Sequence, residues 1–96
     1  MEKFNKASVE QFFDVILKLE TIEECYKFFE DVCTVKEIQD LAQRLDIAVM
    51  LSEKSNYNLI SQTVGASSAT IGRVNKCLMY GSGGYNLAID KIKGDK

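Results

Sequence analysis

Apolar residues recur along the first half of the chain at the spacing of one face of an α-helix. Each of three successive sets follows the helical repeat, in which positions three and four residues apart lie side by side. The sets are Val9, Phe12, Phe13, Ile16 and Leu17; Ile22, Cys25, Tyr26, Phe29, Val32 and Cys33; and Ile38, Leu41, Ala42, Leu45, Ala48 and Val49. The pattern therefore predicts three amphipathic helices.

A helix start signal precedes each set. A hydroxyl residue followed three positions later by Glu or Gln is typical of a capping box, in which each side chain bonds a backbone amide of the first turn. This arrangement occurs at residues 8–11, 21–24 and 34–37. We expect helices to begin directly after Ser8, Thr21 and Thr34.

After Lys54 the segments become shorter and are separated by polar or glycine-rich breaks. The pattern predicts helices over residues 57–64 and from 68 to about 79, and a last short helix over 85–93. Because the chain also lacks proline, it is predicted to be all-α, a short helical bundle in one domain over residues 1–96. Within that domain we assign residues 8–54 to dimerisation helices, 57–80 to a helix-turn-helix and 85–93 to a terminal helix.

The residues from 57 to 74 meet the requirements of a helix-turn-helix, in which two helices cross sharply through a turn of three or four residues. Gly65 readily adopts the positive φ that the first residue of the turn requires. Ser67 is a good N-cap for the second helix. Ser61 is small where the second helix passes close. The angle between the helices would be filled by Ile60, Val64, Ile71 and Val74.

The outward side of the second helix suits entry into the major groove of DNA. Short side chains let the backbone approach the base edges, Arg pairs bidentately with guanine, and a helix N-terminus with hydroxyl groups binds phosphate. Gly72 has two interpretations: it permits close approach to DNA, or it is a helix defect that costs about 1 kcal/mol relative to Ala. We expect DNA contacts from Lys54, Asn58, Ser67, Ser68, Ala69, Thr70, Gly72, Arg73 and Lys76.

Charge is distributed unevenly along the chain. The net charge of the 96 residues is only −2, but residues 1–53 carry −6 and residues 54–96 carry +4. No acidic residue lies between Lys54 and Tyr80. This asymmetry favours a second half that approaches a polyanion, although a solvated face of this charge is the simpler alternative.

Composition excludes several classes of protein. The hydrophobic share of 46% and charged share of 27% are those of a folded globular domain, and no apolar run is long enough for a membrane span or a signal peptide. The chain has no His, so we expect no catalytic centre, zinc site or cofactor. Three cysteines cannot form a closed disulfide framework; we expect them to be small buried hydrophobes in a reduced, cytoplasmic protein.

Residues 64–73 resemble a conserved block of the Trp repressor (TrpR) family. The sequence there is Val-Gly-Ala-Ser-Ser-Ala-Thr-Ile-Gly-Arg, against Leu-Gly-Ala-x-x-Ala-Thr-Ile-Thr/Ser-Arg in the family. Residues 34–51 are similar to the long helix that precedes the family's DNA-reading head. The runs at 21–29, 73–75 and 83–85 are shared with the Trp-repressor-like YerC/YecD group, and the resemblance covers about residues 10–90.

The resemblance implies an intertwined homodimer that regulates transcription, as a repressor, by placing two recognition helices in successive major grooves of double-stranded DNA. The Trp repressor is itself a standard example of this docking geometry. The aromatic content of the first half suits an intersubunit core, since short helices bury so many rings poorly on their own: Phe4, Phe12, Phe13, Phe28 and Phe29. The alternatives are a monomeric bundle, and a helical protein-interaction module that does not bind DNA.

The resemblance also bears on a small-molecule corepressor. In the repressor one Arg on each of two helices holds tryptophan, and Arg44 and Arg73 match these positions. Two other positions depart, because the family's Gly beside the indole is Val74 here and the Ser that meets the amino group is Cys77. Tryptophan is therefore not expected to bind, and the Arg pair is left for another ligand, for DNA phosphate or for helix docking. For Arg44 a salt bridge with Asp40 or Asp46 is the structural alternative.

Overall fold

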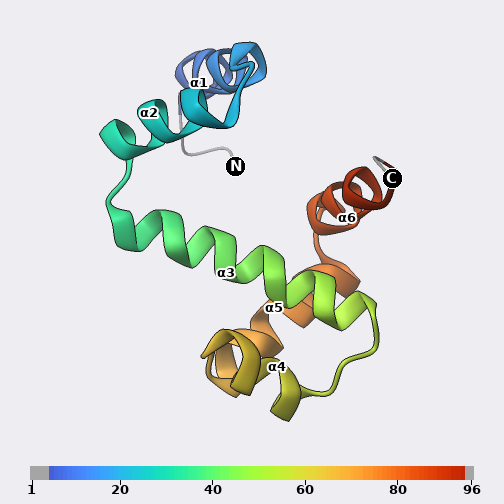
Figure 1. Ribbon diagram of the computed structural model, residues 1–96. Coiled ribbons are helices and arrows are strands. Elements are labelled where there is room, and N and C mark those ends of the chain that lie inside the picture. The colour runs from blue at the N-terminus through green and yellow to red at the C-terminus, as the bar shows by residue number, and fades with distance from the viewer. Residues whose placement is uncertain (1–4, 95–96) are drawn as a thin grey trace. The chain divides into compact units, whose positions relative to one another are not determined.

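The computed structural model describes residues 5–94, in which every regular element is an α-helix and no strand occurs (Figure 1). The all-α fold is thus confirmed, and the helices expected in the second half differ from the observed ones by no more than one residue at either end. The helices are α1 (Lys6–Lys18), α2 (Ile22–Val32), α3 (Val35–Ser52), α4 (Tyr57–Val64), α5 (Ser68–Tyr80) and α6 (Gly84–Gly94).

One of the three expected capping boxes forms in full, at Thr34, and one forms in part, at Thr21. The backbone amide of Glu37 donates to the Thr34 hydroxyl at 3.0 Å, and the Thr34 amide donates to the Glu37 carboxylate at 2.8 Å. At the start of α2 the amide of Glu24 donates to the Thr21 hydroxyl at 3.0 Å. There the Glu24 carboxylate reaches one residue further back and accepts from the amide of Glu20 at 2.8 Å.

The expectation that Ser8 caps the first helix is wrong. Asn5 is the N-cap, its side-chain oxygen accepts from the Ser8 amide at 3.1 Å, and α1 begins at Lys6. Asn caps helices as well as Ser does. Because Asn5 lies three residues before Ser8, its capping places Ser8 inside the first turn.

The helices form two compact units, the first ending at Ile38 and the second beginning at Gln39 within α3. In the first unit α1 and α2 pack through aromatic rings, yet neither helix has a fully buried residue. The ring centroids of Phe12 and Phe28 lie 5.7 Å apart, and those of Phe28 and Phe29 meet edge to face at 5.3 Å. Phe4, expected to join this cluster, lies outside the described residues.

The second unit has a continuous core to which four helices contribute. Its buried residues are Ile47 and Ala48 from α3, Ile60 from α4, Ala66 from the turn, Ile71 and Val74 from α5, and Ile89 from α6. Three positions on α3 differ from the expected apolar set: Ile47, absent from it, is fully buried, while Leu41 and Ala42, included in it, are exposed, Leu41 by 51%. The core face of α3 is therefore rotated from the one that its apolar spacing indicated.

Candidate functional site

The helix-turn-helix over residues 57–80, here called the head, is built by local backbone chemistry. Helix α4 ends at Gly65, whose φ of 74° and ψ of 22° are left-handed and whose amide donates to the Ser61 carbonyl at 2.8 Å. Two residues later the hydroxyl of Ser67 accepts from the amide of Thr70 at 3.2 Å and starts α5. A glycine and a serine thereby form the sharp turn of three residues that connects α4 to α5.

The angle between α4 and α5 is filled by aliphatic side chains. Ile60 and Ile71 are fully buried, Val74 is 2% exposed, and Val64 packs partly buried against them. These are the four residues that the sequence placed there. Ile71 and Val74 occupy the inner side of α5, which leaves Arg73, between them in the sequence, on the outer side.

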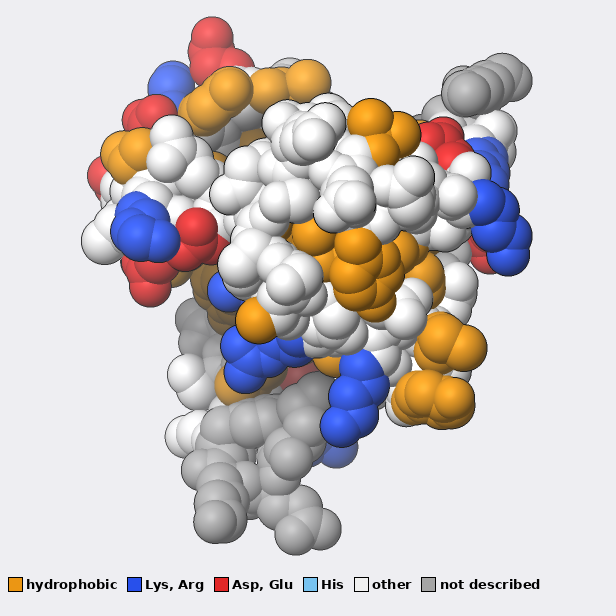
Figure 2. All heavy atoms as spheres, turned by 90° about the horizontal axis from the view of Figure 1, so that it is seen from below, with side chains coloured by type: hydrophobic (Ala, Val, Ile, Leu, Met, Phe, Trp, Pro, Cys, Tyr) orange, Lys and Arg blue, Asp and Glu red, His pale blue; other side chains and the backbone are white. Residues whose placement is uncertain are grey.

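The proposed DNA contacts lie mostly at the surface of the head. Arg73 and Lys76 are exposed on α5, close to its exposed N-terminal residues, while Thr70 and Gly72 are partly buried. Lys54 lies apart from α5, on the connection from α3 to α4, and Asn58 lies in the first turn of α4. Figure 2 shows the surface from the side on which α4 lies in Figure 1, with uncharged and hydrophobic side chains at its centre.

Lys54 has the only positive φ, 68°, among the non-glycine residues described. Its amide donates to the Leu51 carbonyl, and the amide of Ser55 donates to the Met50 carbonyl, each at 3.0 Å. These bonds form a Schellman motif, whose left-handed position is usually glycine. The backbone of Lys54 is therefore strained in order to end α3 at this point.

Arg44 and Arg73, paired from the sequence, line the same open pocket of about 320 Å³. Val74 and Cys77, the two positions that depart from the repressor pattern, line it as well. The remaining lining residue is Tyr85 at the start of α6. The sequence did not indicate that Tyr85 would lie beside the two arginines. No acidic side chain lines the pocket, so its charge is positive.

Two expectations about single side chains change with the structure. Arg44 forms no ion pair with Asp40 or Asp46 in residues 5–94, so the salt-bridge alternative for Arg44 is not observed. The expectation that the cysteines are buried is wrong: Cys25 and Cys77 are exposed and Cys33 is half-buried. Cys25 lies on the uncovered face of α2, and Cys77 opens onto the pocket beside Arg73.

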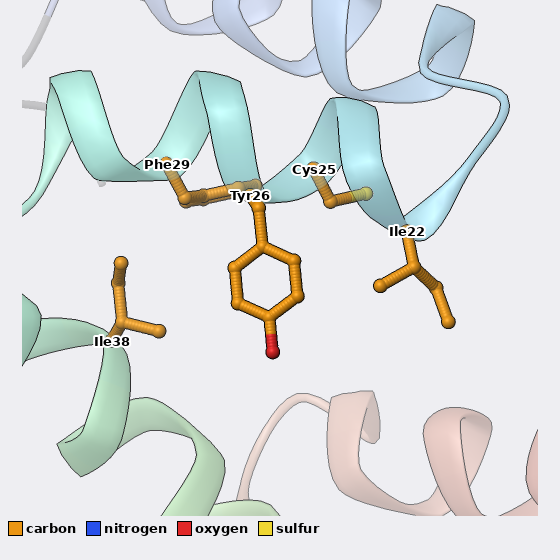
Figure 3. A pocket seen from close by; sticks show the side chains of 5 residues that line it. All are labelled: Ile22, Cys25, Tyr26, Phe29 and Ile38. Atoms are coloured by element: carbon orange, nitrogen blue, oxygen red, sulfur yellow. The ribbon is translucent and has the colours of Figure 1, made fainter.

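An apolar groove of about 230 Å³ lies in the first unit, lined by Ile22, Cys25, Tyr26, Phe29 and Ile38. Figure 3 shows four of these side chains projecting from the same side of α2, with Ile38 at the far edge of the groove. Ile22 is 78% and Tyr26 60% exposed. Exposed apolar surface of this kind usually marks a site that another surface covers.

The described part of the chain meets the requirements neither of a metal site nor of a membrane-spanning helix. Residues 5–94 hold no group of three or more His, Cys, Asp or Glu side chains arranged to bind a metal ion. No helix there combines the length and the apolar character needed to cross a bilayer.

Comparison with known proteins gives matches along nearly the whole chain. A family model described as Trp repressor protein matches residues 7–93. An uncharacterized protein, YerC, from Bacillus subtilis (strain 168) is 48% identical over 93 residues, which are 97% of this chain and 89% of that protein.

Two solved structures share the fold. A crystal structure from Staphylococcus aureus, provisionally named as a Trp repressor, has a TM-score of 0.90 at 47% identity and covers 96% of this chain and 92% of that one. A TrpR like protein from Eubacterium eligens ATCC 27750 has a TM-score of 0.92 at 45% identity, with 97% and 96% covered. The likeness therefore extends over both units and is not confined to the head.

Proposed function

The chain belongs to the Trp repressor protein family, and from this premise we propose that it is a homodimeric, sequence-specific DNA-binding regulator of transcription that acts as a repressor. The observation that carries the proposal is the head itself. Its left-handed Gly65 and its Ser67 cap direct the N-terminal end of α5 outward. That end bears small, polar and basic side chains, and neither α4 nor α5 contains an acidic residue.

Each of the expected contact residues has a distinct task in this proposal. Arg73 reads a guanine through paired hydrogen bonds, while Lys54 and Lys76 bind phosphates and contribute affinity without sequence preference. The N-terminus of α5, with the hydroxyls of Ser67, Ser68 and Thr70, receives a further phosphate. Asn58, Ala69 and Gly72 complete the contact surface, the last two by allowing close approach.

The first unit supports the homodimer. Helices α1 and α2 bury no residue fully within one chain, and their aromatic cluster adjoins the exposed groove of Figure 3. A second copy that covers this groove would remove its apolar side chains from water, which is the main favourable term in association. Sedimentation equilibrium should give twice the chain mass, whereas a single-chain mass would contradict the proposal.

Salt-dependent DNA binding tests the proposed function. Lys54 and Lys76 in each subunit give four phosphate contacts per dimer, so the slope of log K against log salt should be about −4. Genomic fragments selected with the purified protein would supply the sequence for this titration. A slope near zero, or no binding at low salt, would instead favour a helical protein-interaction module.

A double variant assigns the binding to the head. Arg73→Ala with Lys76→Ala should weaken DNA binding by at least the roughly 1–3 kcal/mol of one guanine contact, while changing folding stability by no more than about 0.5 kcal/mol. Lys91→Ala with Lys93→Ala is the matched control, because it removes the same charge from exposed positions on α6. Equal losses in both double variants would show that charge alone, and not the head, governs binding.

We propose that the pocket between Arg44 and Arg73 does not accept L-tryptophan. Val74 lines the pocket and is 2% exposed, so its side chain is held in the core and cannot swing aside. Overfilling a packed site costs about 1–3 kcal/mol, which is up to about two decades of affinity. The chain contains no Trp, so added tryptophan is the sole indole fluorophore. Saturable micromolar binding that tightens DNA binding would refute the proposal.

A further inference from the structure

Two side chains bond backbone carbonyls at the turn of the head. The Nε2 of Gln43 on α3 donates to the Val64 carbonyl at 2.9 Å, and the hydroxyl of Ser61 donates to the Ala66 carbonyl at 2.7 Å. Val64 is the last residue of α4, where the carbonyls have no partner within the helix. Gln43 therefore donates a hydrogen bond to a carbonyl at the end of α4 that has no partner within the helix, 21 residues further along the chain.

The Gln43 bond lies at the side of an open groove between α3 and α4. This groove, of about 490 Å³, is lined by Gln39, Ala42, Gln43, Asp46, Met50, Thr63 and Val64. The groove is open, and Val64 at its side is only partly buried against the core. The buried contacts of Ile47 and Ala48 with the head lie deeper, in the core.

We propose that Gln43 is a positioning residue, whose hydrogen bond to the Val64 carbonyl fixes the angle of the head on α3. A head held by its core contacts alone could pivot about them, and the bond restrains that pivot at the turn. This inference rests on the proposed DNA-binding function, because the head angle then sets the spacing between the two recognition helices of a dimer. Dimeric helix-turn-helix proteins match that spacing to half-sites one helical turn apart.

Gln43→Met tests the bond, since it keeps the length of the side chain and removes the donor. Gln39→Met is the matched control, because Gln39 lines the same groove one helical turn earlier and its side chain makes no hydrogen bond in residues 5–94. Amide hydrogen exchange at Gly65, whose amide bonds Ser61, reports on the end of α4. Loss of one net hydrogen bond should accelerate that exchange by about fivefold in Gln43→Met and leave it unchanged in Gln39→Met.

Gln43→Glu provides a second variant of the same size, in which an acceptor replaces the donor. It should accelerate exchange at least as much, because the carboxylate faces a carbonyl oxygen. Unchanged exchange in both Gln43 variants would overturn the inference, whatever their effect on DNA binding.

A series of DNA duplexes with different half-site spacings tests the consequence. Wild-type protein should prefer one spacing sharply, and in Gln43→Met the affinity ratio between that spacing and one shifted by a base pair should fall toward one. The slope of log K against log salt should not change, because no charge is removed. An unchanged ratio would show that the bond orders the turn without positioning the head. If the wild type binds no DNA, the proposed function fails, and the exchange data alone decide whether Gln43 holds the head.

Discussion

Lys54 combines a backbone role with a proposed DNA contact, and two substitutions at this position separate them. Its φ of 68° is a conformation that costs a residue with a side chain about 1–2 kcal/mol. Glycine avoids that cost but loses about 0.5–1 kcal/mol more in conformational entropy on folding. Lys54→Gly should therefore raise the free energy of unfolding by about 1 kcal/mol over Lys54→Ala, which keeps the strain.

Urea unfolding of the two variants measures this difference. For a domain of this size about 1 kcal/mol corresponds to a rise of about 4–8 °C in Tm. Both variants remove the same positive charge, so both should reduce the magnitude of the salt slope of DNA binding by about 2, one phosphate from each subunit. Equal stability of the two variants would refute the argument from strain, and an unchanged salt slope would refute the phosphate contact.

Two glycines of the head should respond in opposite ways to an added side chain. Gly65→Val should destabilise the fold by about 1–3 kcal/mol, because a β-branched residue resists the left-handed conformation; Gly65→Asn, which tolerates it better, should cost much less in the same urea titration. Gly72→Ala should stabilise the fold by about 1 kcal/mol, because a β-carbon there meets no atom within 4 Å. A matching fall in its DNA affinity would support close approach at Gly72, and unchanged affinity would support a helix defect.

The parts of the fold that were predictable depend on residues close together in the sequence. The bounds of α4, the turn at Gly65 and the cap at Ser67 follow from glycine conformation and from hydroxyl capping, which act over a few residues. The start of α1 was misplaced for the same reason. Asn5 and Ser8 are both good N-caps, and Asn and Ser stabilise a helix start about equally, so residue type does not decide between them.

The face that each helix buries was less predictable, because it depends on what the helix packs against. Leu41 and Ile47 lie on α3 with similar hydrophobicity, yet Leu41 is 51% exposed and Ile47 fully buried. The cysteines show the same limit, since a thiol carries no local signal for burial. Tyr85 joins the arginine pocket only because α6 folds back on α5 after the glycine-rich break.

The side chains that join distant segments left a weak signal of their own. Gln43 occupies one of the polar positions of α3, between Ala42 and Arg44, and its partner is a backbone carbonyl, which any residue would provide. Ser61 carried more information, because a small residue was expected there to admit the second helix. The structure adds that its hydroxyl bonds the Ala66 carbonyl, so alanine would meet the need for space but leave that carbonyl without the bond. Both residues bond the same turn, from α3 and from α4. The geometry of the head thus depends on polar contacts at its turn as well as on the aliphatic core that periodicity reveals.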